Sequence, residues 1–375
     1  MPGAVARLAS GGKSLNVRLA SESERSNWDA LIAANPGGGE VWAGSSYLDV
    51  KTREGGYRSY HLIVERRGAE GAPARSDIAV AVLAKRVPLL GEWWHLPAGP
   101  AGEDASAVLE VSTAVAAFAR ARGAFLLKVE PRLGIDALPQ LRSAGYRETV
   151  RIIPNPSTIL VNVAGTEDEV FARLGKKARN AINRARRDGI VVSRVAATDE
   201  NCAVLYRLLQ ETAEGRFVLR SEQYYREFWQ TFERSGSGQI FLAHRADESG
   251  EPQLVAGAFA MALGNITTYK DGASVRAKTA YGASHALQWE VIRWAVERDA
   301  VLHDLCGAPP ADRADDKTHP LHGVGQFKRS FAPEIIDYVG AFDLPLKPRA
   351  YAFWTKLGDR LLRRWSLAVR KDPYY

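Results

Sequence analysis

The pattern of hydrophobic and polar positions along the chain predicts two successive blocks, each a mixture of strands and helices. Strands are expected where short runs alternate or are uniformly apolar, and helices where apolar residues recur every three or four positions. In the first block the predicted strands are 14–20, 57–67, 76–87, 91–97 and 124–131, and helices begin near Ser21 and span 45–52 and 105–123. In the second block the predicted strands are 157–163, 191–196, 239–246, 253–263, 266–274 and 301–308, with helices at 168–190, 200–216, 221–236 and 284–300.

The two blocks repeat one order of elements: a strand, helices, a run of antiparallel strands, a helix and a further strand. The segment Pro-Asn-Pro-Ser at 154–157 separates them and is rich in residues that favour turns. A duplicated unit of this kind resembles two acetyltransferase-like (GNAT) folds in tandem. The predicted fold class is therefore α/β with mixed (α+β) sheets, in two tandem GNAT-like acyltransferase domains.

The helix predicted at 168–190 carries a dense set of cations. Val170, Ala178, Ile182 and Ala185 form an apolar stripe at helical spacing, so one side packs and the other stays cationic. A solvated surface helix is the ordinary role of such a run. The density of charge favours a polyanion, either an RNA backbone or a diphosphate, as its ligand. The basic residues are Arg173, Lys176, Lys177, Arg179, Arg184, Arg186 and Arg187.

A second cationic segment runs from Lys347 onward. Aromatic and leucine residues recur there every three or four positions, with basic residues on the other side of the predicted helix. Such a helix suits the interface of an anionic membrane, or it docks on its own domain and extends its basic side chains to solvent. The apolar residues are Phe353, Trp354, Leu357, Leu361 and Trp365, and the basic ones are Lys356, Arg360, Arg363 and Arg364.

These two segments account for the basic character of the protein. The net charge is +7, from 50 Lys and Arg against 43 Asp and Glu. Residues 173–188 hold seven basic residues and one acidic residue, and residues 347–375 hold eight and two. The remainder of the chain is therefore net negative. An anionic partner is expected at these two places rather than over the whole surface.

The composition also excludes several classes of protein. The two cysteines, Cys202 and Cys306, cannot form a disulfide framework or a four-cysteine zinc site. The sequence has no apolar run of 18 residues and no secretory signal, so a cytoplasmic protein is expected. Motifs of zinc hydrolases, serine hydrolases, P-loop and Rossmann proteins are missing, and no cofactor or metal is expected. This favours a transferase whose substrate arrives already activated.

Two short segments of the second block are candidates for chemistry. Lys328 lies between Phe327 and Phe331 and follows two glycines, a context that could hold an ammonium group near developing negative charge. A lysine at the edge of a strand is the alternative. Tyr269 and Asp271 lie in the sequence Tyr-Lys-Asp-Gly-Ala-Ser at the end of a predicted strand. The basic, Gly-rich loop with which GNAT enzymes bind coenzyme A has no match, so acetyl-CoA chemistry is disfavoured.

Four segments resemble the Fem family, the tRNA-dependent aminoacyltransferases that build peptidoglycan bridges. They are residues 176–192, 269–274, 286–308 and 323–346. The last two are the more specific, with Asp-Leu-x-Gly, Phe-Lys-x-x-Phe and Tyr-Val-Gly-x-x-Asp at family-like spacing. The likeness extends over residues 40–346 and is clearest in the second half.

The resemblance implies a fold and a reaction. Two GNAT-like domains would comprise residues 1–152 with 337–375, where the chain returns to the first domain and ends in the basic helix, and residues 153–336. The long coiled-coil arm of some members is missing, so the chain resembles the compact type. The donor would be an aminoacyl-tRNA. The acceptor would be the stem-peptide amine of UDP-MurNAc-pentapeptide or lipid II, and the amino acid Gly, Ala or Ser.

The resemblance also implies roles for single residues. Lys51 and Arg220 match family positions that contact the acceptor diphosphate, and Tyr224 and Tyr269 match pocket tyrosines. Lys328 matches a lysine that acts at the tRNA end or on the oxyanion. The tRNA acceptor stem would meet the basic helix through Lys176, Lys177, Arg179, Arg184 and Arg187.

The sequence departs from the family pattern where specificity is expected. It has His303-Asp304-Leu305-Cys306-Gly307 where relatives often have Tyr-Asp-Leu-Gly-Gly, and Asp271 where some have a second tyrosine. Asp271 or Asp304 could accept the amine proton. Deprotonation assisted by water or by the substrate is the alternative, because a carboxylate is a weak base unless its pKa is raised.

Other functions remain open at this point. The acceptor could be a peptide or nucleoside natural product, or the protein could be a non-catalytic RNA- or membrane-binding scaffold. Peripheral contact with the cytoplasmic face of the membrane through the last helix is expected in the leading hypothesis. The sequence does not identify the amino acid, the number added or the oligomeric state.

Overall fold

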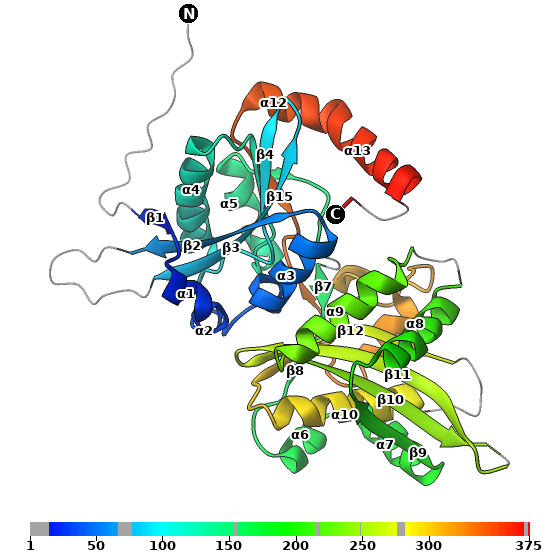
Figure 1. The fold of residues 1–375 in the computed structure, drawn as a ribbon. Coiled ribbons are helices and arrows are strands. Elements are labelled where there is room, and N and C mark those ends of the chain that lie inside the picture. Colours follow the sequence, from blue (N-terminus) through cyan, green and yellow to red (C-terminus); the bar gives the residue numbers. More distant parts are fainter. Residues whose placement is uncertain are drawn as a thin grey trace, which may run out of the picture.

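The computed structural model describes residues 15–66, 77–153, 156–214, 218–247, 249–275, 282–370 and 374–375. The chain forms two lobes, each built on its own sheet (Figure 1). Both sheets contain parallel and antiparallel pairs, so the predicted α/β class with mixed sheets is confirmed. Residues 154–155 and 215–216, on which parts of the prediction fall, lie outside the described residues.

The first lobe contains a sheet of seven strands among the described residues, in the order β1-β2-β3-β4-β5-β15-β6. β15 comes from near the end of the chain and pairs antiparallel with β5, whereas β4 and β5 are parallel. The strands are β1 (Asn16–Leu19), β2 (Arg58–Glu65), β3 (Ile78–Val87), β4 (Gly91–Leu96), β5 (Leu126–Val129), β6 (Arg147–Glu148) and β15 (Phe342–Pro345). The helices are α1 (Glu22–Ser26), α2 (Trp28–Ala33), η1 (Val41–Ala43), α3 (Ser45–Glu54), α4 (Ala105–Ala121), η2 (Ile135–Ala137) and α5 (Leu138–Ser143).

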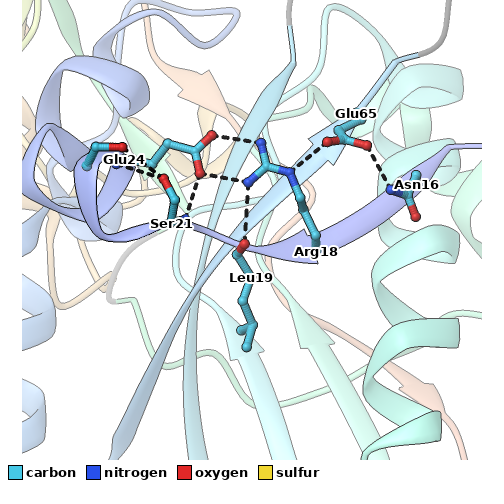
Figure 2. Close-up of polar contacts among 7 residues, drawn as sticks. Asn16, Arg18, Leu19, Ser21, Glu24 and Glu65 are labelled. Carbon is cyan, nitrogen blue, oxygen red and sulfur yellow. Dashed lines mark hydrogen bonds and ion pairs between the residues drawn. The ribbon is translucent and has the colours of Figure 1, made fainter.

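An ion-pair network fixes the edge of this sheet. The guanidinium of Arg18 on β1 donates to Glu24 of α1 at 2.7 Å and to Glu65 of β2 at 2.6 Å (Figure 2). The Ser21 side chain accepts a hydrogen bond from the Glu24 N–H, and the Glu24 carboxylate accepts one from the Ser21 N–H, as expected for a capping box at the start of α1. Arg18 therefore connects β1 to both α1 and β2.

The second lobe contains a sheet of six strands among the described residues, in the order β8-β13-β12-β11-β10-β9. The strands are β8 (Leu160–Asn162), β9 (Ile190–Val195), β10 (Gly238–Ala246), β11 (Pro252–Leu263), β12 (Ile266–Ser274) and β13 (Leu302–Asp304). The helices are α6 (Glu167–Arg173), α7 (Lys176–Arg187), α8 (Asp199–Ala213), α9 (Glu222–Arg234), α10 (Ala283–Val296), η4 (Ala311–Arg313) and α11 (His322–Lys328). A small sheet pairs β7 (Ser157–Thr158) with β14 (Ile336–Asp337).

The single long helix predicted at 168–190 is wrong, because the chain forms two helices there. Leu174 is extended between α6 and α7, at φ −60° and ψ 149°. Gly175 lies so close to the main chain after α11 that a Cβ at this position would be 2.3 Å from the Ser330 carbonyl oxygen. The periodicity of the basic run continues through this point, so the sequence pattern does not show the interruption.

The α3–α9 contact joins the lobes. Buried aromatic residues of α9 pack in one hydrophobic cluster with residues of both sheets. At the contact, the Ser46 and Ser235 hydroxyls lie 2.8 Å apart, and Arg53 donates to the Thr231 hydroxyl at 2.9 Å. This contact sets the position of α3 against α9, the elements that border the pocket described below.

The end of the chain forms a helix over residues 348–370 on the first lobe (Figure 1). Its parts are α12 (Pro348–Phe353), the π-helical turn η5 (Trp354–Gly358), α13 (Asp359–Trp365) and the π-helical turn η6 (Ser366–Arg370). Trp354 is buried and packs edge-to-face on Phe125 at 5.8 Å, which docks the helix. In the described part of the chain no helix has both the length and the apolar character needed to cross a bilayer.

Candidate active site

Three basic side chains meet at a pocket between the lobes, here called the cationic pocket. It encloses about 210 Å³, and its cations are Lys51, Lys85 and Arg220. Lys51 lies on the last turn of α3, Lys85 on β3, and Arg220 immediately before the N-cap of α9. Among the described residues that line it, Glu54 is the one acidic side chain. The excess of positive charge suits an anion with more than one charged oxygen.

The lysines are held by aromatic rings rather than by bulk water. Lys51 is 3% exposed, and its ammonium lies 5.2 Å from the centre of the Tyr57 ring and 5.8 Å from that of Tyr47. Lys85 is 9% exposed and lies 4.2 Å from the Tyr57 ring. Burying an ammonium is costly unless it is compensated, and ring faces compensate it only in part. The Lys85 ammonium also donates to the Tyr374 main-chain carbonyl.

The N-terminal end of α9 adds the positive end of a helix dipole to the charges of the lysine and arginine side chains. Ser221 caps the helix by accepting from the Tyr224 N–H at 3.2 Å, and both residues line the pocket. The Arg220 guanidinium lies 4.5 Å from the centre of the Tyr224 ring, and Tyr206 donates to the Arg220 carbonyl at 2.9 Å. The N-terminal end of a 13-residue helix favours negative charge. The structure thus brings the predicted residues Lys51, Arg220 and Tyr224 together.

Lys328 forms a second centre, here called the Lys328 cluster. It is the last residue of α11, not a strand-edge lysine, and it is 7% exposed. Its ammonium donates to the Cys306 carbonyl and, at 2.9 Å, to the Gly307 carbonyl. Burial lowers the pKa of Lys328 to about 8. The side chain can therefore carry or release a proton near neutral pH.

Tyr269 belongs to the Lys328 cluster. Its ring centre lies 5.8 Å from the Lys328 ammonium, and burial raises the pKa of its hydroxyl, which stays protonated. A Cβ at position 272 would lie 1.7 Å from that hydroxyl, so the glycine makes room for the tyrosine. This explains why a glycine follows Asp271 in the predicted motif.

Asp304 is buried at the end of β13 and is occupied by donors. It accepts from the Thr158 hydroxyl and, at 2.8 Å, from the Cys306 N–H, and it lies 3.6 Å from the Arg132 guanidinium. Proton transfer to this carboxylate would have to displace or share one of these bonds. The geometry suits a residue that orients the Cys306–Gly307 carbonyls for Lys328.

Asp271 lies on the α9 side of β12, apart from Tyr269. Its carboxylate accepts from Trp229 Nε1 at 2.9 Å and from Lys270 at 2.8 Å. The Tyr225 ring of α9 lies 5.3 Å from the Lys270 ammonium and 5.9 Å from the ring of Tyr224, which lines the cationic pocket. Asp271 is therefore linked to the cationic pocket through Lys270, Tyr225 and Tyr224.

Neighbouring residues of the predicted motif are unsuited to direct chemistry. Burial lowers the pKa of His303 to about 4, and its ring nitrogens are bonded to Thr267 and Gln288, each at 2.8 Å. Burial raises the pKa of the Cys306 thiol, which stays protonated. Among the described residues, no three His, Cys, Asp or Glu side chains are grouped so that they could hold a metal ion.

A cavity of about 270 Å³ between the lobes adjoins Asp304, and we call it the interlobe cavity. Arg132 Nε donates to the Glu40 carboxylate at 2.9 Å on its wall, and burial raises the pKa of Glu40. Sequence reasoning missed Glu40, Arg132 and, in the cationic pocket, Lys85. These residues lie in loops or on a strand and belong to no motif or periodic pattern, so the sequence did not indicate a functional role for them.

The basic residues predicted to bind tRNA lie on α7, which begins beside the segment that follows Lys328. Small apolar residues of α7 are buried and face α10, where a Cβ on Gly282 would lie 2.8 Å from the Ala181 carbonyl oxygen. Arg179 is half-buried and donates to the Ala172 carbonyl at 2.6 Å, and Arg184 lies 3.4 Å from Asp188. Lys176, Lys177, Arg184 and Arg187 are exposed.

Comparison with known proteins relates this geometry to a family. A family model described as the FemAB family matches residues 141–245 and 238–358. Lipid II:glycine glycyltransferase of Staphylococcus epidermidis is 22% identical over 414 aligned positions, which take in 92% of this chain and 96% of that protein. The protein of the same name from Staphylococcus haemolyticus is 20% identical, over 92% of this chain and 96% of that protein.

Solved structures agree at the level of the fold. The crystal structure of FemX superposes with a TM-score of 0.72 at 16% identity, over 90% of this chain and 99% of that chain. The family match takes in Arg220, Tyr224, Tyr269 and Lys328, whereas Lys51 and Lys85 precede it. Lys51 and Lys85 of the first lobe are therefore included only in the matches that extend over most of the chain. Arg220, Tyr224, Tyr269 and Lys328 of the second lobe are included in the family match as well.

Proposed function

The chain belongs to the FemAB family, and from this premise we propose that it is an aminoacyltransferase of peptidoglycan synthesis. It transfers an amino acid of the Gly, Ala or Ser class from aminoacyl-tRNA to the stem-peptide amine of a peptidoglycan precursor. Two curated relatives that match most of this chain are named lipid II:glycine glycyltransferase. Their low identity leaves the amino acid open.

The cationic pocket is the observation that carries the proposal. Lipid II and UDP-MurNAc-pentapeptide share a diphosphate, and Lys51, Lys85 and Arg220 surround a cavity between the lobes. Charge-assisted hydrogen bonds from these groups to phosphate oxygens are the stronger class of hydrogen bond. The pocket thus accounts for either precursor, and the lipid or the nucleoside would lie outside it.

The reaction requires charge stabilisation more than a strong base. The acceptor nitrogen forms a bond to the ester carbonyl carbon, and the carbon–oxygen bond to the terminal ribose of the tRNA breaks. The proton lost by the nitrogen ends on the released ribose hydroxyl. Lys328, in its ammonium form, stabilises the oxyanion between these steps. Its two carbonyl partners, on Cys306 and Gly307, hold the ammonium in place until that charge develops.

The two carboxylates take supporting roles in this proposal. Asp304 positions the Cys306–Gly307 segment and through it Lys328. Asp271 pairs with Lys270 beside Tyr225. Both oxygens of Asp271 accept hydrogen bonds. Asp304 accepts two hydrogen bonds on Oδ1, and its Oδ2 lies 3.6 Å from the Arg132 guanidinium. Proton removal by water or substrate therefore fits the geometry better than removal by either residue.

The basic side of α7 is the proposed site for the acceptor stem of the tRNA. Its apolar side is used in packing, so the exposed cations are available to a phosphate backbone. Burial and, to a lesser degree, the charge of Lys177 lower the pKa of His285 to about 4, and His285 packs on Phe327, the residue before Lys328. The helix therefore extends from the surface towards the reacting end of a bound tRNA.

The helix over residues 348–370 is the proposed contact with the membrane. Trp354 and Tyr351 are buried and dock it, and Leu362 is partly buried, but six other large apolar residues stay between 46% and 62% exposed. Exposed apolar side chains with Lys and Arg beside them suit the surface of an anionic bilayer. The exposed residues are Phe353, Leu357, Leu361, Trp365, Leu367 and Val369.

A screen with charged tRNA tests the proposal. The protein is incubated with individually charged tRNAs and either lipid II or UDP-MurNAc-pentapeptide, and the products are analysed by mass spectrometry. We expect the mass increment of one amino acid, lost after ribonuclease treatment. No increment with any charged tRNA on either acceptor would contradict it, and salt-dependent tRNA binding without turnover would then favour a non-catalytic RNA-binding protein. Transfer to a peptide or nucleoside natural product alone would leave the reaction but change the acceptor.

A further inference from the structure

We propose that the segment Tyr374–Tyr375 is a built-in competitor of the acceptor, which occupies the cationic pocket and must leave before a diphosphate binds. Both residues line the pocket together with Lys51, Lys85 and Arg220. The inference rests on the proposed function, because it takes this pocket to be the diphosphate site. It adds a regulation that neither the family nor the pocket cations imply.

The main chain of the segment bonds the cations directly. The main-chain carbonyl oxygen of Tyr374 accepts from the Lys85 ammonium, and a main-chain oxygen of Tyr375, the last residue of the sequence, accepts from the Arg220 guanidinium. Two oxygen atoms thus lie against two of the three cations of the pocket. A phosphate oxygen would use the same donors, so the segment and a bound diphosphate cannot both make these contacts.

The two aromatic rings fill the remaining space. The centre of the Tyr374 ring lies 4.1 Å from the Lys85 ammonium, and its hydroxyl accepts from Trp93 Nε1 at 3.4 Å. The Tyr375 ring packs edge-to-face on Trp93 at 5.5 Å, and its hydroxyl bonds Asp359 of α13. The segment is therefore attached both to the pocket and to the helix over 348–370, as the position of the chain end between the lobes indicates (Figure 1).

The balance of charges makes the occupancy reversible. The Tyr374 carbonyl is a neutral acceptor and the segment brings at most one negative main-chain charge, on Tyr375, whereas a diphosphate brings several negative charges to the same donors and bonds them more strongly. The docked segment lowers the apparent affinity of the pocket in proportion to the fraction of molecules in which it is bound. A tightly bound acceptor displaces it, and weakly bound anions do not. The segment would thus protect a highly cationic pocket from adventitious anions.

The first experiment measures binding of inorganic pyrophosphate by calorimetry. Four full-length proteins are compared: wild type, the double variant Tyr374→Ser/Tyr375→Ser, Lys51→Ala, and Ile135→Ser. Ile135 is 54% exposed on the first lobe and serves as the control for loss of an apolar surface side chain. The double variant loses the rings that anchor the segment, and we expect pyrophosphate to bind about tenfold more tightly to it than to wild type. Lys51→Ala should weaken binding, and Ile135→Ser should leave it unchanged.

The outcomes separate the inference from the proposed function. Equal or weaker binding by the double variant, with loss of binding in Lys51→Ala, would overturn the competitor and leave the diphosphate pocket standing. Failure of every protein to bind pyrophosphate would overturn both. Tighter binding by the double variant alone supports the competitor.

A second measurement needs no destabilising change. The protein is labelled with 3-fluorotyrosine, and the ¹⁹F signals of residues 374 and 375 are assigned from Tyr374→Phe and Tyr375→Phe. Adding pyrophosphate should move both signals to the narrow, solvent-exposed position while the Tyr351 signal stays in place. Signals of 374 and 375 that do not move when pyrophosphate is bound would overturn the inference.

Discussion

Lys328 is a buried ammonium group held by two main-chain carbonyls, and its charge state links the structure to the reaction. Burial lowers its pKa to about 8 from the ordinary value of 10.5. The group is therefore charged at neutral pH and becomes neutral as the pH rises through 8. An oxyanion is stabilised by the charged form only, so the two states differ in activity.

The pH profile of Lys328→Arg tests this role. In wild type we expect kcat/KM to fall above about pH 8, because the ammonium form is lost. Arginine stays protonated throughout this range, so the variant should be less active at pH 7 but should lack this limb. Lys328→Ala should reduce kcat by about 10²–10³-fold, the usual cost of an oxyanion donor. An identical limb near pH 8 in Lys328→Arg would assign that ionisation to another group.

Lys85 and Arg86 offer a matched pair on one strand. Lys85 is buried in the cationic pocket, whereas the next residue of β3 is exposed. We expect Lys85→Ala to raise the KM for the acceptor about tenfold with little change in kcat, because a charge-assisted hydrogen bond to substrate contributes about 1.5–3 kcal/mol. Arg86→Ala should leave both constants as in wild type. Equal effects of the two variants would mean that general charge, not the pocket, binds the acceptor.

At the scale of the elements, the break between α6 and α7 fixes the basic helix against α11. Gly175 approaches the main chain of Ser330, and Gly323 of α11 has open space around the position of a Cβ. We expect Gly175→Ala to lower the free energy of unfolding by about 1–3 kcal/mol, because the backbones must separate. Gly323→Ala should be neutral or stabilising by up to about 1 kcal/mol, because alanine favours a helix. Chemical denaturation of the two variants measures both, and a stable Gly175→Ala would show that the contact is loose.

The helix over 348–370 predicts a difference between acceptors. Phe353, Leu357 and Leu361 are exposed on it, and replacing all three by serine removes apolar contact with a bilayer. We expect flotation with vesicles of anionic phospholipid to decrease and turnover of vesicle-borne lipid II to fall more than turnover of UDP-MurNAc-pentapeptide. An equal loss of turnover with both acceptors would indicate that these three apolar residues contribute to folding instead.

At the scale of the whole molecule, much of the architecture follows from periodicity. The alternation of strands and helices predicts both sheets, because each element has one apolar face and length suited to its type. The interruption at Gly175 could not be predicted, because it depends on Ser330, which is 155 positions away in the sequence. The pairing of β15 with β5 is likewise a long-range event, and only the family resemblance suggested it.

The candidate site also contains some residues that the sequence predicted and others that it did not. Lys51, Arg220 and Tyr224 were predicted from the resemblance to the Fem family, and Tyr269 and Lys328 both from that resemblance and from the residues around them. Lys85, Arg132 and Glu40 were not, because each acts through a partner distant in sequence. The segment 374–375 could not be placed in the pocket from the sequence, since two tyrosines after a basic helix have no pattern that points to a cation site.

Transfer of one labelled amino acid in a single turnover shows whether the protein moves an aminoacyl group to an acceptor held in the cationic pocket. Aminoacyl-tRNA carrying the amino acid found in the screen is mixed with excess enzyme and lipid II, and labelled lipid II is counted over time for wild type, Lys51→Ala and Arg86→Ala. We expect label on lipid II with wild type and Arg86→Ala, and a transfer by Lys51→Ala that is restored only by raising the lipid II concentration. Transfer by Lys51→Ala at the wild-type rate at low lipid II, or no labelled lipid II with any of the three proteins, would contradict it.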